Sequence, residues 1–187
     1  MTTHAETGGR PGNRWTPLIW SVAAGLILLP FVAMQFTREV RWTATDFVFA
    51  AVMIGGSCVV LELALRLTRN WAYRGGVVLA LAAIFLLVWI NGAVGIIGNE
   101  GNPLNLLYGC VIMTAIGGAM GAGFRAAGMA RGMAAAAVVM LLIGMFVVTS
   151  GRTDPPGAID YVAIHLFFAM IFAGSALLFR KAAREQS

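Results

Sequence analysis

Charged residues are scarce in this sequence, which has 11% Asp, Glu, Lys and Arg against 59% hydrophobic residues over 187 positions. This composition is too apolar for an ordinary water-soluble domain, so it excludes a soluble globular enzyme. The 13 Lys and Arg exceed the 8 Asp and Glu, giving a net charge of +5. Because these charges stand between apolar runs and form no basic patch, we expect no nucleic acid as a partner.

Histidine and cysteine are equally rare, with two of each. Haem pairs, di-iron centres and the usual zinc sites need more ligands, so we expect no metal and no cofactor. Cys58 and Cys110 are expected at different depths of the membrane, too far apart for a disulfide. The phosphate-binding loop, GxSxG, HExxH and the dinucleotide fingerprint are all missing from the sequence. We therefore expect no catalytic residues, and a non-enzymatic protein more readily than an enzyme.

Long apolar runs are what the sequence does have. A bilayer core about 30 Å thick is crossed by roughly 20 helical residues, and six runs have about that length. The sequence thus predicts an all-α, polytopic transmembrane bundle. We expect a disordered cytoplasmic N-terminal tail over 1–16, one six-helix transmembrane domain over 17–179, and a cytoplasmic C-terminal tail over 180–187. The predicted spans are 17–36, 46–65, 75–97, 105–124, 133–149 and 160–179.

The distribution of Lys and Arg predicts the orientation, because positive residues resist translocation. With the N-terminus in the cytoplasm, 10 of the 13 Lys and Arg fall inside, and only Arg38, Arg41 and Arg152 fall outside. Both termini are therefore expected in the cytoplasm.

Charged residues near the predicted helix ends have structural interpretations. Asp46 and Asp160 each begin a predicted span, where a carboxylate can cap free backbone N–H groups. Glu62 precedes Arg66 by four residues, the spacing of a helical ion pair. We expect capping and a salt bridge at these positions, and aromatic membrane anchors at Tyr108 and Tyr161.

Small residues indicate how the helices pack, since helices in lipid associate through close backbone approach. The sequence contains 23 glycines, and Gly117 and Gly121 form a small-xxx-small surface on the fourth predicted span. We favour packing within the chain over a homo-oligomer interface for this pair, although both stay open.

Polar residues gather toward the outer end of the predicted bundle. His165 lies five residues, about 7.5 Å, inside the sixth span, and Asn91 lies at a similar depth in the third. A polar outer loop without Lys or Arg carries Glu100, followed by Asn105 and Tyr108. These five residues are the candidate ligand-binding site, for a cation, a proton or the headgroup of a lipid or quinone. The alternative, which we favour, is that they are interhelical hydrogen-bonding groups, a turn and a helix cap.

Three segments of the chain resemble an uncharacterised group of small bacterial polytopic inner-membrane proteins. They are Trp42-Thr43 with Asp46-Phe47, then Ala72-Tyr73-Arg74, and most specifically the stretch 86–108. The resemblance implies a bacterial inner (cytoplasmic) membrane location, and it implies no activity.

The sequence supports two hypotheses about function. The first is a non-enzymatic accessory or structural subunit that packs through glycine-rich helix faces against a membrane-protein partner or a second copy. The second is a minimal transporter or channel with an outward-facing polar entrance near Asn91, Glu100 and His165. Polar side chains are sparse in the inner half of the predicted bundle, which disfavours a continuous transport path.

Overall fold

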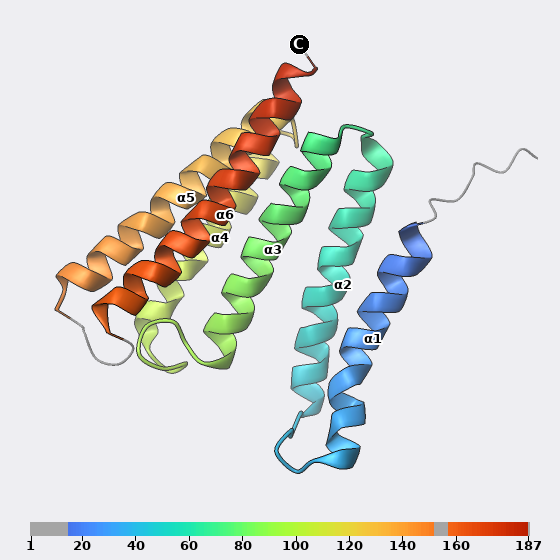
Figure 1. Cartoon of the computed structure of the whole chain (residues 1–187), viewed down its shortest axis with the longest axis vertical. Helices are drawn as coiled ribbons and strands as arrows, with labels where there is room; N and C mark the ends of the chain where they lie inside the picture. Colours follow the sequence, from blue (N-terminus) through green and yellow to red (C-terminus); the bar gives the residue numbers. More distant parts are fainter. Residues whose placement is uncertain (1–14, 152–156, 187) are drawn as a thin grey trace, which may run out of the picture. The chain divides into compact units, whose positions relative to one another are not determined.

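The structure of the protein is a computed structural model that describes residues 15–151 and 157–186. Within these residues it is all-α, without strands, and six of its helices are long and apolar enough to cross a membrane. The chain is therefore a multi-pass membrane protein by the length and composition of its helices. The helices, shown in Figure 1, are α1 (Trp15–Phe36), α2 (Ala44–Leu67), α3 (Trp71–Ala93), the 3₁₀ turn η1 (Pro103–Leu106), α4 (Leu107–Gly121), α5 (Ala126–Thr149) and α6 (Ala158–Arg184).

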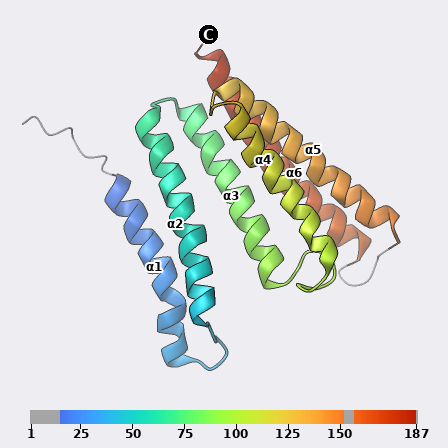
Figure 2. The ribbon, with the colours of Figure 1, turned by 180° about the vertical axis from the view of Figure 1, so that it is seen from behind.

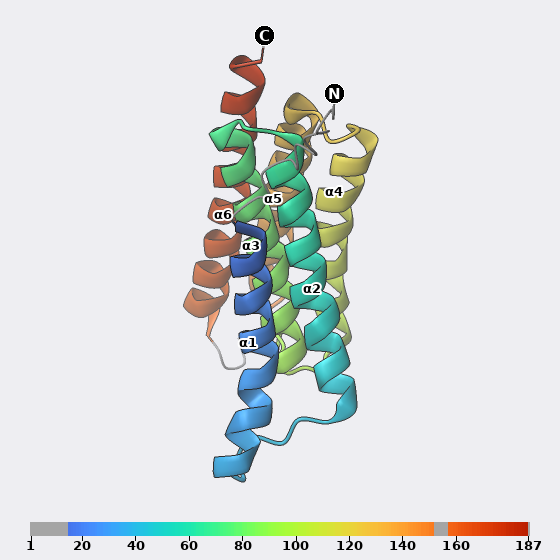
Figure 3. The same cartoon turned by 90° about the vertical axis from the view of Figure 1, so that its right-hand side faces the viewer.

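The contacts divide the chain into two compact units, Met1–Leu67 and Thr68–Ser187. The sequence predicts a single six-helix domain over 17–179. The first unit contributes the α1–α2 hairpin, whose two helices are joined at one end by a short loop (Figure 3). The second contains α3 to α6, which alternate in direction; α6 packs against α3 and α5, and α5 packs against α4 (Figure 2).

In the first unit, Glu62 connects the two helices. Its carboxylate pairs with Arg66 on the same helix, which confirms the predicted ion pair. It also accepts hydrogen bonds from Thr16 Oγ1 at 3.0 Å and from Trp20 Nε1 at 2.9 Å, both on α1. Glu62, predicted to form an ion pair within α2, thus also links α2 to α1.

Helix capping partly follows the prediction. Thr43 caps α2, and Asp46 accepts hydrogen bonds from the Thr43 backbone N at 2.7 Å and Oγ1 at 2.8 Å, a reciprocal capping box. At α6 the prediction is wrong, because Gly157 occupies the N-cap position and no side chain makes the capping hydrogen bond. Asn105 does not begin the fourth helix either; Asn102 caps η1 there, accepting from Leu104 N at 3.0 Å.

Several helix boundaries differ from those predicted. The third helix ends at Ala93 instead of 97, because Gly95 adopts φ +71° and turns the chain. The fifth begins at Ala126 instead of 133, and the sixth continues to Arg184, so residues 180–184 of the expected C-terminal tail are helical. Trp15 and residue 16 belong to α1; the rest of the predicted N-terminal tail, 1–14, lies outside the described residues.

Close contacts in the second unit are made by small residues. A Cβ added to Gly118 would lie 2.7 Å from Gly132 Cα, so α4 and α5 meet backbone to backbone. Between α3 and α6, Ser175 Oγ donates to the Gly76 carbonyl at 2.8 Å, and a Cβ on Gly76 would lie 3.0 Å from the Phe179 ring. Packing through small residues and a buried hydroxyl is typical of helices in lipid.

Gly117 and Gly121 do not take part in this packing. A Cβ added at either position would meet no atom within 4 Å, and both residues are exposed. Within the second unit the close helix contact is made by the neighbouring Gly118, which meets Gly132 on α5, and the packing predicted for Gly117 and Gly121 within the chain stays a prediction. Packing of Gly117 and Gly121 against another chain stays a prediction.

Candidate functional site

The polar residues of the second unit meet at one end of its helices. This end combines the C-terminal ends of α3 and α5, the N-terminal ends of α4 and α6, and the loop 94–102, which Figure 1 shows as the yellow-green turn between α3 and α4. Gly95 and Gly98 both have positive φ, and a Cβ on Gly95 would lie 2.2 Å from the Asn99 backbone. The loop therefore depends on glycine to turn back, which buries Ile96 and Ile97.

Asn105 holds this loop with its side chain. Its Oδ1 accepts from Ile97 N at 2.8 Å, while its Nδ2 donates to Asn99 O at 2.7 Å and to Ile97 O at 3.3 Å. The buried side-chain amide of Asn105 therefore both accepts a hydrogen bond from the loop backbone and donates hydrogen bonds to it. Non-helical backbone at membrane depth must find its hydrogen bonds inside the protein, and Asn105 supplies them here.

His165 forms the second part of the cluster. Its Nδ1 lies 2.6 Å from the Tyr161 carbonyl, and its Nε2 lies 3.0 Å from Tyr108 Oη. A carbonyl only accepts, so Nδ1 carries a proton and donates it to Tyr161, while Nε2 and the Tyr108 hydroxyl share the second hydrogen bond. His165 and Tyr108 are almost fully buried, at 2% and 1% exposure. The two hydrogen bonds thus fix the position of the imidazole between α4 and α6.

Two further residues complete the cluster, and neither is among the predicted site residues. Tyr161, expected to be an interfacial anchor, is buried, and its hydroxyl accepts from Gly98 N at 3.2 Å. Gly144 on α5 faces His165: an added Cβ would lie 2.7 Å from the imidazole Cγ. Position 161 lies one helical turn before His165, a spacing that could have indicated Tyr161; no sequence signal singled out Gly144 among the glycines.

Of the two remaining predicted site residues, Asn91 belongs to the cluster and Glu100 does not. Asn91 Nδ2 donates to the Asn105 carbonyl at 3.3 Å, so Asn91 joins the cluster, while its Oδ1 is buried without a hydrogen-bond partner. Glu100 lies on the exposed part of the loop and makes no hydrogen bond to the cluster residues described above. The structure therefore brings together Asn91, Asn105, Tyr108 and His165, and leaves Glu100 apart from them.

The chemistry available to the cluster is limited by its hydrogen bonds. The imidazole and the Asn105 amide are already engaged, and the Tyr108 hydroxyl is directed at His165. Among the described residues, no group of three or more His, Cys, Asp or Glu is placed to hold a metal ion. The arrangement positions a loop against three helices, and its one uncommitted buried atom is Asn91 Oδ1.

Comparison with known proteins gives no further assignment. No protein-family model, no curated protein and no solved structure matches this chain. Any functional assignment therefore rests on the fold and on the geometry of the cluster.

Proposed function

We propose that this protein is a non-enzymatic accessory or structural subunit in a membrane, and that it packs a glycine face of α4 against a helix of another membrane protein. The observation that carries the proposal is the open space beside Gly109, Gly117 and Gly121. All three are exposed on α4, and the exposed side chains of Met113 and Met120 lie along the same helix.

The face of α4 that contains Gly118 already has a packing partner, unlike the face with Gly117 and Gly121, and this difference supports the proposal. Gly118 is in backbone contact with Gly132, so one face of α4 is used within the second unit, and no residue of that unit covers the Gly117–Gly121 face. Small residues spaced by four positions allow a second helix to approach closely in lipid. The hydrogen-bonded cluster also supports a structural role, because its polar groups hold a loop instead of lining an open path.

Site-specific photo-crosslinking in the native host tests the proposal. We expect a photoreactive residue at Met113 or Met120 to give one adduct of defined mass with another membrane protein. The same residue at Met145, exposed on α5, is the matched control and gives none. Gly117→Leu, which fills the open face, abolishes the adduct. Equal labelling at Met113 and Met145 contradicts the proposal. An adduct with the mass of two copies of this chain would show that the partner is a second copy of the protein and not another membrane protein.

A second candidate function, transport, is favoured by one observation, the unpartnered Asn91 Oδ1. A buried acceptor of this kind suits a water, a protonated ligand or a hydrated cation. Proteoliposomes with a pH dye and an imposed Na⁺ or K⁺ gradient test it. Flux above that of empty vesicles, lost in Asn91→Leu, favours transport over the accessory role; no flux supports the accessory role.

The membrane and the orientation are part of the same proposal. We infer a bacterial inner membrane with both termini in the cytoplasm. This inference is supported by the count of 10 Lys and Arg on the proposed inner side against three on the outer side, and by the resemblance of stretch 86–108 to small bacterial membrane proteins.

A further inference from the structure

A groove of about 840 Å³ runs between α5 and α6. It lies toward the end of the unit where α5 begins and α6 finishes, opposite the polar cluster. Its lining consists of seven alanines, one valine, one leucine and three arginines, without any acidic residue among those described. The groove thus has an apolar floor, and the charged residues that line it are all positive.

The groove, with its arginine end included, is about half as long as a bilayer core is thick. It is lined by α5 from Ala127 to Val138 and by α6 from Ala173 to Arg184, eleven residue steps on each helix. At 1.5 Å per residue this is about 16 Å, half of a bilayer core about 30 Å thick, and about 10 Å of it lies beyond Arg131 and Arg180. Alanine side chains are short, which leaves room for an extended hydrocarbon chain lying along the two helices.

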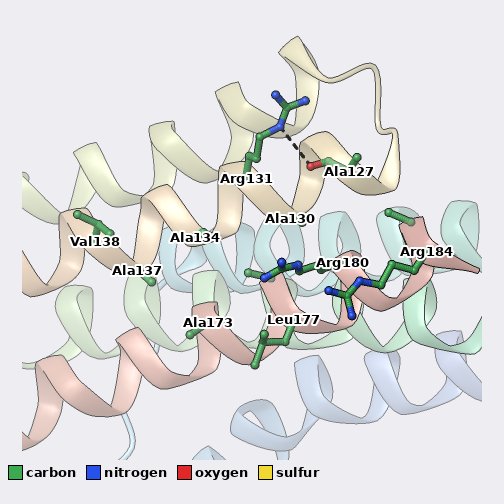
Figure 4. A pocket seen from close by; sticks show the side chains of 12 residues that line it. Ala127, Ala130, Arg131, Ala134, Ala137, Val138, Ala173, Leu177, Arg180 and Arg184 are labelled. Atoms are coloured by element: carbon green, nitrogen blue, oxygen red, sulfur yellow. Dashed lines mark hydrogen bonds between the residues drawn. The ribbon is translucent and has the colours of Figure 1, made fainter.

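The charges gather at one end of this floor. Arg131 extends from α5, and Arg180 and Arg184 extend from α6, toward the end of the groove where α6 finishes, while Ala134, Ala137 and Ala173 lie on the far side of Arg131 and Arg180 (Figure 4). All three arginines are exposed, and Arg131 Nε makes only a long hydrogen bond of 3.4 Å to the Ala127 carbonyl. Guanidinium groups bind phosphate through paired N–H donors, and basic pockets between transmembrane helices suit anionic lipid headgroups.

We propose that this groove binds one anionic phospholipid, with an acyl chain along the alanine floor and the phosphate at Arg131, Arg180 and Arg184. The combination carries the proposal, because a phospholipid has a phosphate for the arginines and an acyl chain whose first part fits the apolar floor next to them. The proposal is independent of the helix partner proposed for α4.

Native mass spectrometry of the full chain in mild detergent, titrated with phosphatidylglycerol and in parallel with phosphatidylcholine, tests the charge. We expect one phosphatidylglycerol to bind in preference to phosphatidylcholine, and the triple variant Arg131→Gln, Arg180→Gln, Arg184→Gln to weaken this binding roughly tenfold or more. The matched control is Arg38→Gln, Arg41→Gln, Arg69→Gln, which removes three charges that do not line the groove. Equal loss in both triple variants, or equal binding of the two lipids, overturns the proposal.

A second pair of variants tests the floor without changing any charge. Ala134 is exposed and lines the groove, whereas its neighbour Ala135 is exposed and does not. We expect Ala134→Phe to weaken phosphatidylglycerol binding and Ala135→Phe to leave it unchanged, with both variants folded by circular dichroism. Binding that Ala134→Phe does not affect overturns the acyl-chain part. Glycerol phosphate competing as strongly as the whole lipid also overturns it, since the arginines would then be a site for a free phosphate ester.

Discussion

His165 is buried where α5 crosses α6, and the absence of a side chain on its neighbour decides whether it fits. Gly144 leaves room for the imidazole, which then shares a hydrogen bond with the Tyr108 hydroxyl and donates to the Tyr161 carbonyl. A single methyl group at position 144 would displace the ring and both of its hydrogen bonds. At the scale of one residue, the cluster therefore depends on a glycine that carries no chemistry of its own.

We predict that Gly144→Ala destabilises the protein. The added Cβ would lie 2.7 Å from His165 Cγ, and overpacking of this kind costs about 1–3 kcal/mol. The free energy of unfolding, measured by titration with a denaturing detergent, should fall by this amount. Gly117→Ala is the matched control, because its Cβ enters open space; it should leave that free energy unchanged or raise it slightly. Equal destabilisation by both variants would contradict the contact.

The candidate site can be predicted from single residues only in part. Asn91, Asn105, Tyr108 and His165 converge as expected, because polar groups at equal depth in lipid have few partners other than one another. For Tyr161 the sequence predicts an interfacial anchor, since a tyrosine near a span end fits both roles until the loop that covers it is known. Glu100 belongs to the predicted site only by its position in the loop, and the turn at Gly98 leaves it exposed.

At the scale of one element, the loop 94–102 is the least regular part of the second unit, and its order depends on one amide. Asn105→Leu removes the side-chain partners of Ile97 N and Ile97 O, while Asn99 O loses one donor and keeps the other, Asn102 N at 3.1 Å. Unpaired buried backbone groups cost about 1–3 kcal/mol each, so the loop should open more often. We predict faster amide hydrogen exchange across 95–102 in this variant, measured by mass spectrometry, with α5 unchanged.

Asn99→Ala serves as the control for that experiment, since its side chain bonds only Gly101 N, at 3.0 Å, within the loop. Exchange across 95–102 that rises as much in Asn99→Ala as in Asn105→Leu would show that the amide of Asn105 has no special role.

The α1–α2 hairpin has its own connecting group in Glu62, which accepts from Thr16, Trp20 and Arg66. We predict that Glu62→Ala lowers the free energy of unfolding of this hairpin, because both α1 donors, Thr16 and Trp20, lose their acceptor. Fluorescence of a variant that keeps Trp20 as its only tryptophan monitors the transition. Glu39→Ala, which removes a carboxylate from the connecting loop, is the control and should leave the free energy of unfolding unchanged. If Glu39→Ala lowers it as much as Glu62→Ala does, the effect comes from the loss of a negative charge and not from the loss of the hydrogen bonds.

The existence of the helices can be read from the apolar runs, because bilayer thickness sets their length. Helix ends are harder to predict, since apolar residues continue beyond the helix at 94–97, where glycine conformation and not hydropathy stops α3. The start of α5 at Ala126 is missed for a different reason. An arginine at position 131 favours a loop in the sequence, yet its long side chain lets it lie inside a helix near the membrane surface.

At the scale of the whole molecule, the helices of the second unit alternate in direction, so the loop 94–102 and the end of α6 lie at opposite ends (Figure 1). We predict that reporters inserted between Gly98 and Pro103 and fused after Ser187 fall on opposite sides of the membrane. A reporter between Arg69 and Asn70 is the control and should share the side of the C-terminal fusion. Two reporters on the same side at Gly98–Pro103 and after Ser187 would contradict the six-span topology.

The short fourth helix has a consequence for the surrounding lipid. α4 has 15 residues, about 22 Å of α-helix, and η1 adds about 8 Å, whereas α5 has 24 residues, about 36 Å. Hydrophobic mismatch makes a bilayer thin or thicken to match the protein it touches. α4 therefore reaches the thickness of a bilayer core, about 30 Å, only together with η1, and the bilayer bordering α4 is expected to thin whenever η1 unwinds.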